Sequence, residues 1–359
     1  MNNIIIHGID DTYSEKDKEK IIREVFLSAS GNCSWLKRQD IVLLKPALNS
    51  PDLYPATTDP LTIRVIAEIL EEKGARVVIG DQSGIGHVLH TSNGVLRGSS
   101  RDNYRKSGMG NGITSTFVAF EEEGWDKGFD HYQSTYTQSW PKGFYITHWV
   151  KKADHIISLP RISTHAQTGV TLGFKNMVGF LREDSRMEFH ANGPFFYFME
   201  THSGGLSGNG KKFNAPSFFH KITEISDAVR KKLRLTVFTA TKLQTTMGPD
   251  SHTAGIIPSH VVIPTPGVCI ASSDQVMGEA SALAFLMIIQ KKVSIDKKIV
   301  QRFLRFVNPL VQDLETTSVW GNPFIAHALE LQFGYKRSNV QYKNIPKKLE
   351  SEFAHVFVG

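Results

Sequence analysis

Cysteine is scarce in this sequence of 359 residues, which contains only Cys33 and Cys269. Two isolated cysteines cannot form a disulfide framework or a CxxC metal motif. A standard iron–sulfur cluster needs about four cysteine ligands. The chain therefore cannot hold such a cluster alone, which excludes electron transfer through a cluster of its own.

Long hydrophobic runs and a concentrated basic region are also missing. The longest mostly apolar stretch, residues 280–289, is too short to span a bilayer, and the N-terminal MNNIIIHGIDD lacks the basic start of a signal peptide. The net charge is +6, but lysine and arginine are scattered and form no stripe with interleaved aromatic residues. We therefore expect a cytoplasmic protein that binds neither nucleic acid nor membrane. A small anionic metabolite fits the basic composition.

The hydrophobic pattern that is present predicts an α/β fold. A continuous apolar run over residues 41–44 ends in Lys45-Pro46 and predicts a buried strand. A helix is predicted over residues 60–73, and a second strand over 76–79 ends at Gly80-Asp81. Such a unit places two parallel strands in one sheet, and ligands bind outside the carboxyl ends of such strands. Lys45 and the loop 80–86 should share that rim.

The length predicts two domains with a cleft between them. We expect a larger domain over residues 1–225, built on a parallel βαβ sheet, and a smaller α/β domain over residues 226–359. Residues 84–150 are rich in Gly, Ser, Asn and aromatic residues and are weakly periodic. This pattern predicts a long irregular insertion that serves as a lid or as a contact in a homo-oligomer.

One segment carries most of the chemistry, from Leu159 to Gly179. A strand ends at a proline, His165 follows, and Gly169 and Gly173 precede Lys175-Asn176. Glycines let a backbone approach a ligand, and loop amides bind anions. Lysine supplies a charge or a nucleophile, and histidine supplies acid–base or metal chemistry. The alternatives are a structural hydrogen bond for His165 and a solvated lysine.

The other candidate residues also have alternative interpretations. Lys45 contacts an anion or is a structural lysine whose ammonium reaches solvent. Asp81 acts as an acid or base, ligates a metal, or caps a helix. Asn176 binds a ligand or satisfies backbone amides in a turn. His190 ligates a metal or lies at the surface before a loop.

These motifs resemble the family called domain of unknown function 362. The resemblance rests on Lys45-Pro46, Gly80-Asp81, Thr164-His165, Gly169-Val170-Thr171, Lys175-Asn176 and Gly179. It covers residues 40–280 as separate blocks, of which the central block is long and specific. Some members carry ferredoxin-type cysteine motifs, which this chain lacks.

The same segment is more distantly similar to the nickel-pincer lactate racemases. Those enzymes carry a histidine, two glycines, a lysine ten positions after that histidine, and a further histidine about fifteen positions beyond. Here His165, Gly169, Gly173, Lys175 and His190 have similar spacing. The resemblance implies that Lys175 anchors a pyridinium-type cofactor, that His165 is a general acid or base, and that His190 ligates nickel or another divalent metal.

The racemases carry a second catalytic histidine after the strand equivalent to residues 76–79, where this chain reads Gly80-Asp81-Gln82-Ser83. Asp81 or His87 is the candidate to replace it. We therefore expect an enzyme that acts on a small carboxylate-type metabolite by metal- or cofactor-assisted proton transfer. His165, Lys175 and Asp81 would be catalytic, and Lys45, Gly169, Gly173, Lys175 and Asn176 would bind the cofactor. The alternative is a non-catalytic carrier of a metal or cofactor.

Overall fold

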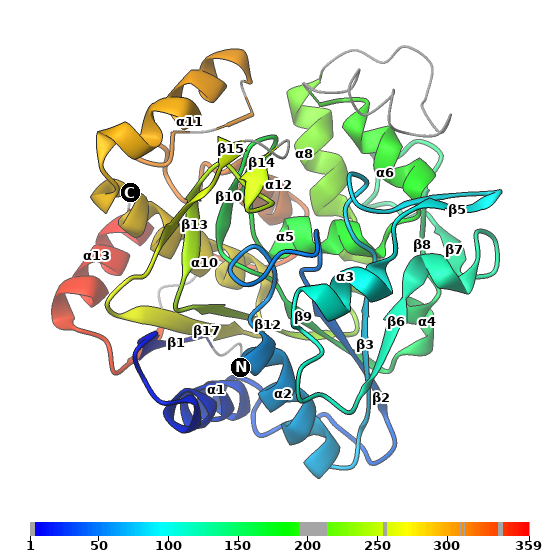
Figure 1. The fold of residues 1–359 in the computed structure, drawn as a ribbon, viewed down its shortest axis with the longest axis horizontal. Coiled ribbons are helices and arrows are strands. Elements are labelled where there is room, and N and C mark those ends of the chain that lie inside the picture. Colours follow the sequence, from blue (N-terminus) through cyan, green and yellow to red (C-terminus); the bar gives the residue numbers. More distant parts are fainter. Residues whose placement is uncertain are drawn as a thin grey trace.

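A large, mostly parallel sheet forms the centre of the molecule. The computed structural model describes residues 4–193, 214–253, 257–308, 310, 311, 313–336 and 340–358. Within them, eight strands form one sheet in the order β18-β1-β17-β12-β9-β2-β3-β6 (Figure 1). Strand β17 runs antiparallel to its neighbours β1 and β12, and the other neighbouring pairs are parallel. The predicted α/β class is confirmed.

The elements have the following bounds. The strands of the large sheet are β1 (Ile4–Ile9), β2 (Ile41–Pro46), β3 (Arg76–Asp81), β6 (Thr116–Ala119), β9 (His155–Leu159), β12 (Leu233–Ala240), β17 (Gly267–Ser272) and β18 (Gln341–Lys343). The longer helices are α1 (Glu15–Ala29), α2 (Pro60–Glu72), α6 (Glu183–His190), α8 (Ala215–Glu224), α10 (Gln275–Lys292), α11 (Ile295–Val307), α12 (Pro323–Glu330) and α13 (Lys347–Val358). A second sheet has the order β11-β10-β13-β16, with β10 (Ser163–His165), β11 (Gly169–Thr171), β13 (Leu243–Thr246) and β16 (His260–Val262).

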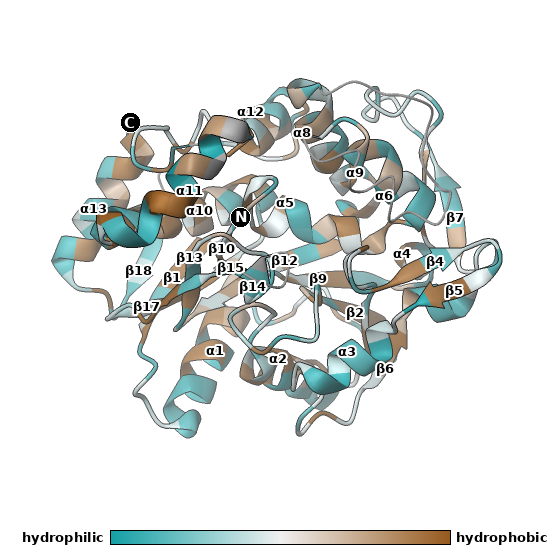
Figure 2. Ribbon diagram, turned by 45° about the horizontal axis from the view of Figure 1, so that its top comes forward, coloured by the Kyte–Doolittle hydropathy of each residue, from teal (hydrophilic) through white to brown (hydrophobic). Residues whose placement is uncertain are grey.

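Helices cover both faces of the large sheet. Figure 2 shows α1 and α2 below it and α10 above it. Alternate residues of β2 face these two layers, because successive side chains of a strand point to opposite faces. Val42 and Leu44 join the core that contains α1 and α2, whereas Leu43 joins the core that contains α10. The sheet is therefore apolar on both faces, which explains the continuous hydrophobic run over residues 41–44.

Helix α2 shows how the sequence sets the helix ends beside the site. Asp59 accepts a hydrogen bond from the backbone N–H of Thr62, and Pro60 occupies the first turn. Gly74 follows the helix with a φ of +86°, a conformation that favours glycine. The predicted strand–helix–strand unit is confirmed, and it brings the ends of β2 and β3 side by side.

Residues 84–150 are not the irregular insertion that the sequence predicts. Strand β6 pairs with β3 at the sheet edge, and two hairpins, β4 (Leu89–Thr91) with β5 (Gly94–Arg97) and β7 (Phe129–Tyr132) with β8 (Phe144–Thr147), flank it. Trp140 is fully buried and donates a hydrogen bond to the backbone carbonyl of Lys221 in α8. Strands of three or four residues carry too little periodicity to be predicted. A role as lid or oligomer contact stays a prediction.

The boundary predicted at residue 225 also stays a prediction. Strands β12, β17 and β18 follow that boundary, yet they lie in the same sheet as β2, β3 and β9. Next to this boundary, α8 ends at Glu224 and the short helix α9 covers Ser226–Val229. None of the helices in the described ranges combines the length and apolar character needed to cross a membrane.

Candidate functional site

A cavity of about 520 Å³ lies at the carboxyl ends of β2, β3 and β9, where the fold predicts a ligand site. It is lined by six of the predicted site residues: Lys45, Asp81, His165, Lys175, Asn176 and His190. The two predicted glycines, Gly169 and Gly173, are not among its lining residues. The predicted site residues, which are up to 145 positions apart in the sequence (Lys45 and His190), thus share one cavity.

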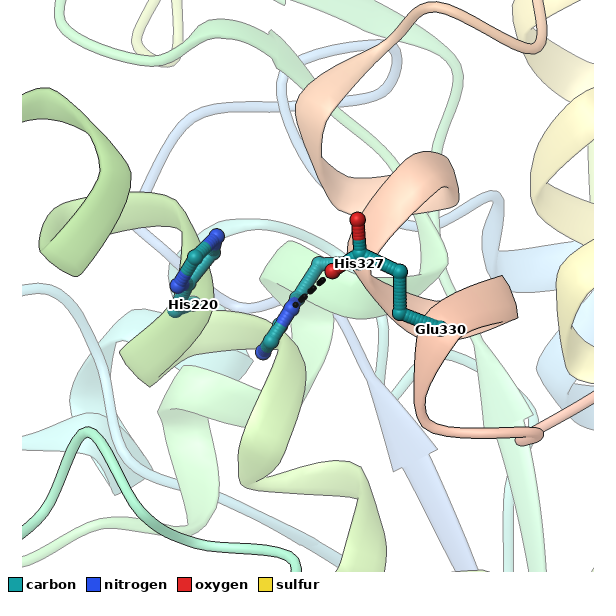
Figure 3. A group of neighbouring side chains, drawn as sticks. All are labelled: His220, His327 and Glu330. Carbon is teal, nitrogen blue, oxygen red and sulfur yellow. Dashed lines mark hydrogen bonds and ion pairs between the residues drawn. The ribbon is translucent and has the colours of Figure 1, made fainter.

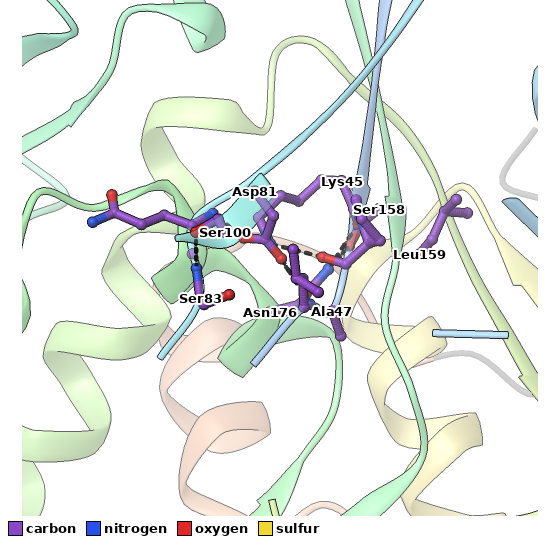
Figure 4. A network of polar contacts seen from close by, with 12 residues as sticks. Lys45, Ala47, Asp81, Ser83, Ser100, Ser158, Leu159 and Asn176 are labelled. Atoms are coloured by element: carbon purple, nitrogen blue, oxygen red, sulfur yellow. Dashed lines mark hydrogen bonds and ion pairs between the residues drawn. The ribbon is translucent and has the colours of Figure 1, made fainter. Parts of the chain in front are cut away.

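Lys45, at the end of β2, is held by a buried polar network (Figure 4). Its Nζ lies 2.7 Å from Asp81 Oδ1 and donates hydrogen bonds to the Pro46 carbonyl at 2.8 Å and to Asn176 Oδ1 at 3.3 Å. Burial lowers the pKa of Lys45, and the Asp81 carboxylate opposes that shift. Three partners occupy the three donors of the ammonium group. Lys45 therefore has little capacity left for a ligand.

Asp81 and Asn176 are equally engaged. Asp81 also accepts the backbone N–H groups of Leu48 and Gln82, at 2.8 and 2.7 Å. The amide of Asn176 donates to the Lys45 carbonyl and to Ser158 Oγ, both at 3.0 Å. The three side chains thus tie β2, β3 and β9 to the short helix α5 (Gly173–Asn176). This network explains why the Lys-Pro, Gly-Asp and Lys-Asn motifs occur together, and it favours a structural role for all three residues.

Gly179 completes this network by its small size. A Cβ atom at position 179 would lie 2.1 Å from Asp81 Oδ1 and 2.6 Å from Lys45 Nζ. Both distances are far below van der Waals contact, so a side chain here would displace the ion pair. The last glycine of the central motif is therefore explained by the close approach of a backbone to a buried charge pair.

The two predicted ligand-binding glycines serve the local fold. Gly169 lies opposite His165 in the β10–β11 hairpin and has a φ of +77°. A Cβ atom on Gly173 would lie 2.8 Å from Glu279 Oε2, which accepts the backbone N–H of Phe174 at the start of α5. Burial raises the pKa of Glu279 to about 8. Both glycines shape the segment that carries His165 and Lys175, and direct contact with a cofactor stays a prediction.

His165 is held in one orientation at the cavity wall. Its Nδ1 accepts the backbone N–H groups of Gln167, at 3.0 Å, and Thr168, at 3.3 Å. Burial, together with the nearby Lys175 charge, lowers the pKa of His165 well below its usual value. The neutral ring therefore carries its proton on Nε2, because Nδ1 must provide the lone pair. In this state His165 is a hydrogen-bond donor through Nε2.

Lys175 lies on the same wall and differs from Lys45 in lacking an anionic partner among the described residues. Its Nζ lies 5.5 Å from the centroid of the Phe189 ring. Burial lowers the pKa of Lys175 to about 7, and the positive charges of Arg186, Arg161 and Lys45 act in the same direction. At neutral pH a substantial fraction of this amine is thus unprotonated and nucleophilic.

Two arginines add positive charge to the cavity, and the sequence-based site omitted both. Arg161 is buried and donates to the Pro249 carbonyl at 2.7 Å, while its Nε has no partner among the described residues. Burial lowers the pKa of Arg161 to about 10. Arg186 donates to four backbone carbonyls and lies 3.9 Å from Glu183. The signal that could have identified Arg161 is its place two residues after β9, on the predicted rim.

A histidine–aspartate pair faces the cavity from the opposite loops. His87 Nε2 lies 2.9 Å from Asp250 Oδ2, and both residues line the cavity. Burial lowers the pKa of His87, but the hydrogen bond and charge of Asp250 outweigh it and raise the pKa overall. Asn49 holds the other oxygen of Asp250 at 2.5 Å. The fold thus supplies a carboxylate-oriented histidine in the loop after β3, where the sequence left His87 as one of two candidates.

His190 ends α6 and is buried at the cavity edge. Its Nδ1 has no hydrogen-bond partner within the described part of the chain, and burial lowers its pKa well below the usual value. A neutral, unsatisfied imidazole nitrogen is suited to ligate a metal. In the described ranges, however, no three His, Cys, Asp or Glu ligand atoms converge in the cavity.

The chain is similar to a known protein family and to a solved structure. A family model described as Domain of unknown function (DUF362) matches residues 42–284. No curated protein matches the chain. Among solved structures, the chain is similar to the lactate racemase apoprotein from Thermoanaerobacterium thermosaccharolyticum, with 14% sequence identity and a TM-score of 0.39. That match covers 72% of this chain and 53% of the racemase, so the chain spans about half the length of that protein.

Proposed function

The chain belongs to the domain of unknown function 362 (DUF362) family, and we propose that it is an enzyme that moves a proton on a small carboxylate-type metabolite in the cavity. The observation that carries this proposal is the unbalanced positive charge. Asp81 neutralises Lys45, and Asp250 accompanies His87, but Arg161 and Lys175 have no ion-pair partner among the described residues. Buried charges are normally paired, so these cations favour an anionic ligand.

His87 is the best placed group to accept a proton. Since its Nε2–H donates to Asp250, its Nδ1 carries the free lone pair in the neutral ring. A carboxylate that orients a histidine and stabilises its charged form is the arrangement used by general bases. We infer that His87 takes a proton from the substrate and that Asp250 positions it.

His165 has a different role in this proposal from the general acid or base expected from the sequence. Acceptance of a proton at Nε2 would require a proton on Nδ1, where two backbone N–H groups already donate. We infer that His165 donates a hydrogen bond from Nε2 to a substrate oxygen and stabilises the charge that develops there. Lys175 and Arg161 bind the carboxylate.

A cofactor is compatible with the same wall. Lys175, with its unpaired amine, and His190, with its unsatisfied Nδ1, are the residues that would hold a lysine-linked pyridinium-type group and a divalent metal such as nickel. Bound there, such a group would supply an electron acceptor or a Lewis acid next to the substrate. Since no three His, Cys, Asp or Glu ligand atoms converge in the described part of the cavity, further metal ligands would come from the cofactor or the substrate.

A second function, a non-catalytic carrier of a metal or cofactor, is favoured by one observation. The racemases to which the sequence is similar use two opposed bases, whereas Nδ1 of His165 is fixed as an acceptor. A carrier needs the anchoring lysine and the cationic cavity but no base. It would hold its ligand without exchanging substrate protons.

Deuterium exchange distinguishes the two functions. The full chain would be incubated in D₂O with a panel of small 2-hydroxy and 2-oxo carboxylates, and label at the carbon next to the carboxylate would be followed by NMR. We expect exchange that is lost in His87→Gln, weakened mainly through KM in Lys175→Met, and kept in His355→Ala on the exposed surface. Stoichiometric binding of a carboxylate or metal without exchange would support the carrier. If wild type neither binds nor exchanges these acids, the proposed substrate class is wrong.

A further inference from the structure

A cluster of two histidines and one glutamate lies away from the cavity, between α8 and α12. His220 comes from α8, and His327 and Glu330 come from α12 (Figure 3). One ligand atom from each of the three lies within 4.8 Å of the others. None of them lines the cavity. From this geometry we propose that these three residues form a binding site for a divalent transition-metal ion, with Zn²⁺ as the preferred ion.

His327 is already oriented as a metal ligand. Its Nε2 lies 3.1 Å from Glu224 Oε1, and Glu224 is almost fully buried. Histidines that ligate metals usually donate their second ring N–H to a carboxylate, which fixes the ring and its tautomer. Nδ1, 3.1 Å from Glu330 Oε2, is therefore the atom left for the metal.

Glu224 is itself fixed in place. Ser139 donates to its carboxylate twice, through the backbone N–H at 3.0 Å and through Oγ at 2.8 Å. The orienting carboxylate of the site is thus built into the core by the loop before β8. These hydrogen bonds to Glu224 are independent of the three proposed ligands. They favour a metal site over a fortuitous cluster of surface side chains.

The ligand set selects the class of metal. Two imidazole nitrogens and one carboxylate oxygen suit Zn²⁺, Co²⁺ and Ni²⁺, whereas Mg²⁺ and Ca²⁺ prefer oxygen ligands alone. Three protein ligands leave one tetrahedral position for water. Glu330 has 70% of its side chain exposed, so the ion can reach the site from solvent.

Binding requires a small rearrangement. The rings of His220 and His327 are stacked, with centroids 3.7 Å apart and an interplanar angle of 12°. A metal lies in the plane of each imidazole that binds it, so His220 must rotate out of the stack, and it is partly exposed and can do so. Carboxylates face both nitrogens of His327, Glu224 at Nε2 and Glu330 at Nδ1, so the ion would take the place of the Nδ1 contact with Glu330.

Titration of the chelator-treated full chain with Co²⁺ and Zn²⁺ tests the site. We expect one equivalent to bind, measured by calorimetry, and visible ligand-field bands with Co²⁺. Glu330→Gln and His220→Asn should weaken binding at least tenfold, and Glu224→Gln by about 10–100-fold. Circular dichroism would verify that each variant is folded.

Three control variants keep the assignment falsifiable. Glu350→Gln and His355→Ala remove exposed side chains of α13 and should bind the ion as wild type does. His190→Ala removes the candidate ligand in the cavity and should also leave this binding unchanged. If wild type binds no equivalent, or if His220→Asn binds as tightly as wild type, the proposal is wrong. If His190→Ala alone abolishes binding, the ion belongs to the cavity and the proposed site is equally refuted.

Discussion

Substitution of Asp81 by Asn separates a structural role from a catalytic one. The carboxylate is buried and accepts from Lys45 Nζ and from two backbone N–H groups. The isosteric amide removes the negative charge and leaves the Lys45 ammonium buried without its counter-ion. Breaking a buried pair in this way costs about 3–5 kcal/mol. We therefore expect Asp81→Asn to lower the free energy of unfolding by about that amount, measured by denaturant titration at pH 7.

Two further variants make this prediction specific. In the double variant Lys45→Met with Asp81→Asn, no unpaired charge remains, so the loss should be smaller than the sum of the two single losses by about 0.5–3 kcal/mol. The exposed ion pair of Arg23 with Glu72 is the control, and Glu72→Gln should cost no more than about 1 kcal/mol. If Asp81→Asn keeps full stability but loses proton exchange, the structural interpretation of Asp81 is refuted and the catalytic one gains support.

Further measurements test the lysine and the glycine of the central segment. Because the pKa of Lys175 is lowered to about 7, the rate of its labelling by an amine reagent should rise with pH through a midpoint near 7. Peptide mass spectrometry would measure this labelling, and a midpoint near 10 would contradict the prediction. The Lys175 amine binds its proton more tightly in the unfolded chain than in the folded protein, so the free energy of unfolding rises as the pH rises above about 7. Because Lys175→Met removes the buried charge that destabilises the folded protein at low pH, it should raise the melting temperature more at pH 6 than at pH 9. Gly179→Ala should cost about 1–3 kcal/mol or more, since the new Cβ meets the ion pair, whereas Gly86→Ala, with open space around it, should be nearly neutral.

The sequence predicted those parts of the fold in which local pattern and tertiary environment agree. The strand–helix–strand unit over residues 41–81 combines continuous apolar strands with a capped amphipathic helix, and its strands lie where expected. The hairpin strands β10 and β11 have three residues each, and β10 also pairs with β13, some 80 positions away in the sequence. Such short strands are defined by their partners and not by their own sequence.

The sequence singled out six residues that line the cavity, but it did not show how their charges pair. Lys45 belongs to the end of β2 and His165 to the end of β10, whereas Lys175 lies in the short helix α5, and only the folded chain brings the three together. Only the structure shows that Asp81 neutralises Lys45, while Arg161 and Lys175 have no ion-pair partner among the described residues. The same limit applies to the proposed metal site, in which His220 and His327 belong to separate helices.

The parallel order of β9, β2 and β3 has a consequence for selectivity. These three hydrogen-bonded neighbours carry Arg161, the Lys45 network and the loop of His87 at their ends. Adjacent strands in a sheet lie about 4.8 Å apart, so the ladder sets the spacing of these groups before any ligand arrives. In the proposed site, this fixed spacing would select ligands by the separation of their polar groups. A preformed site of this kind would lose little conformational entropy when a ligand binds.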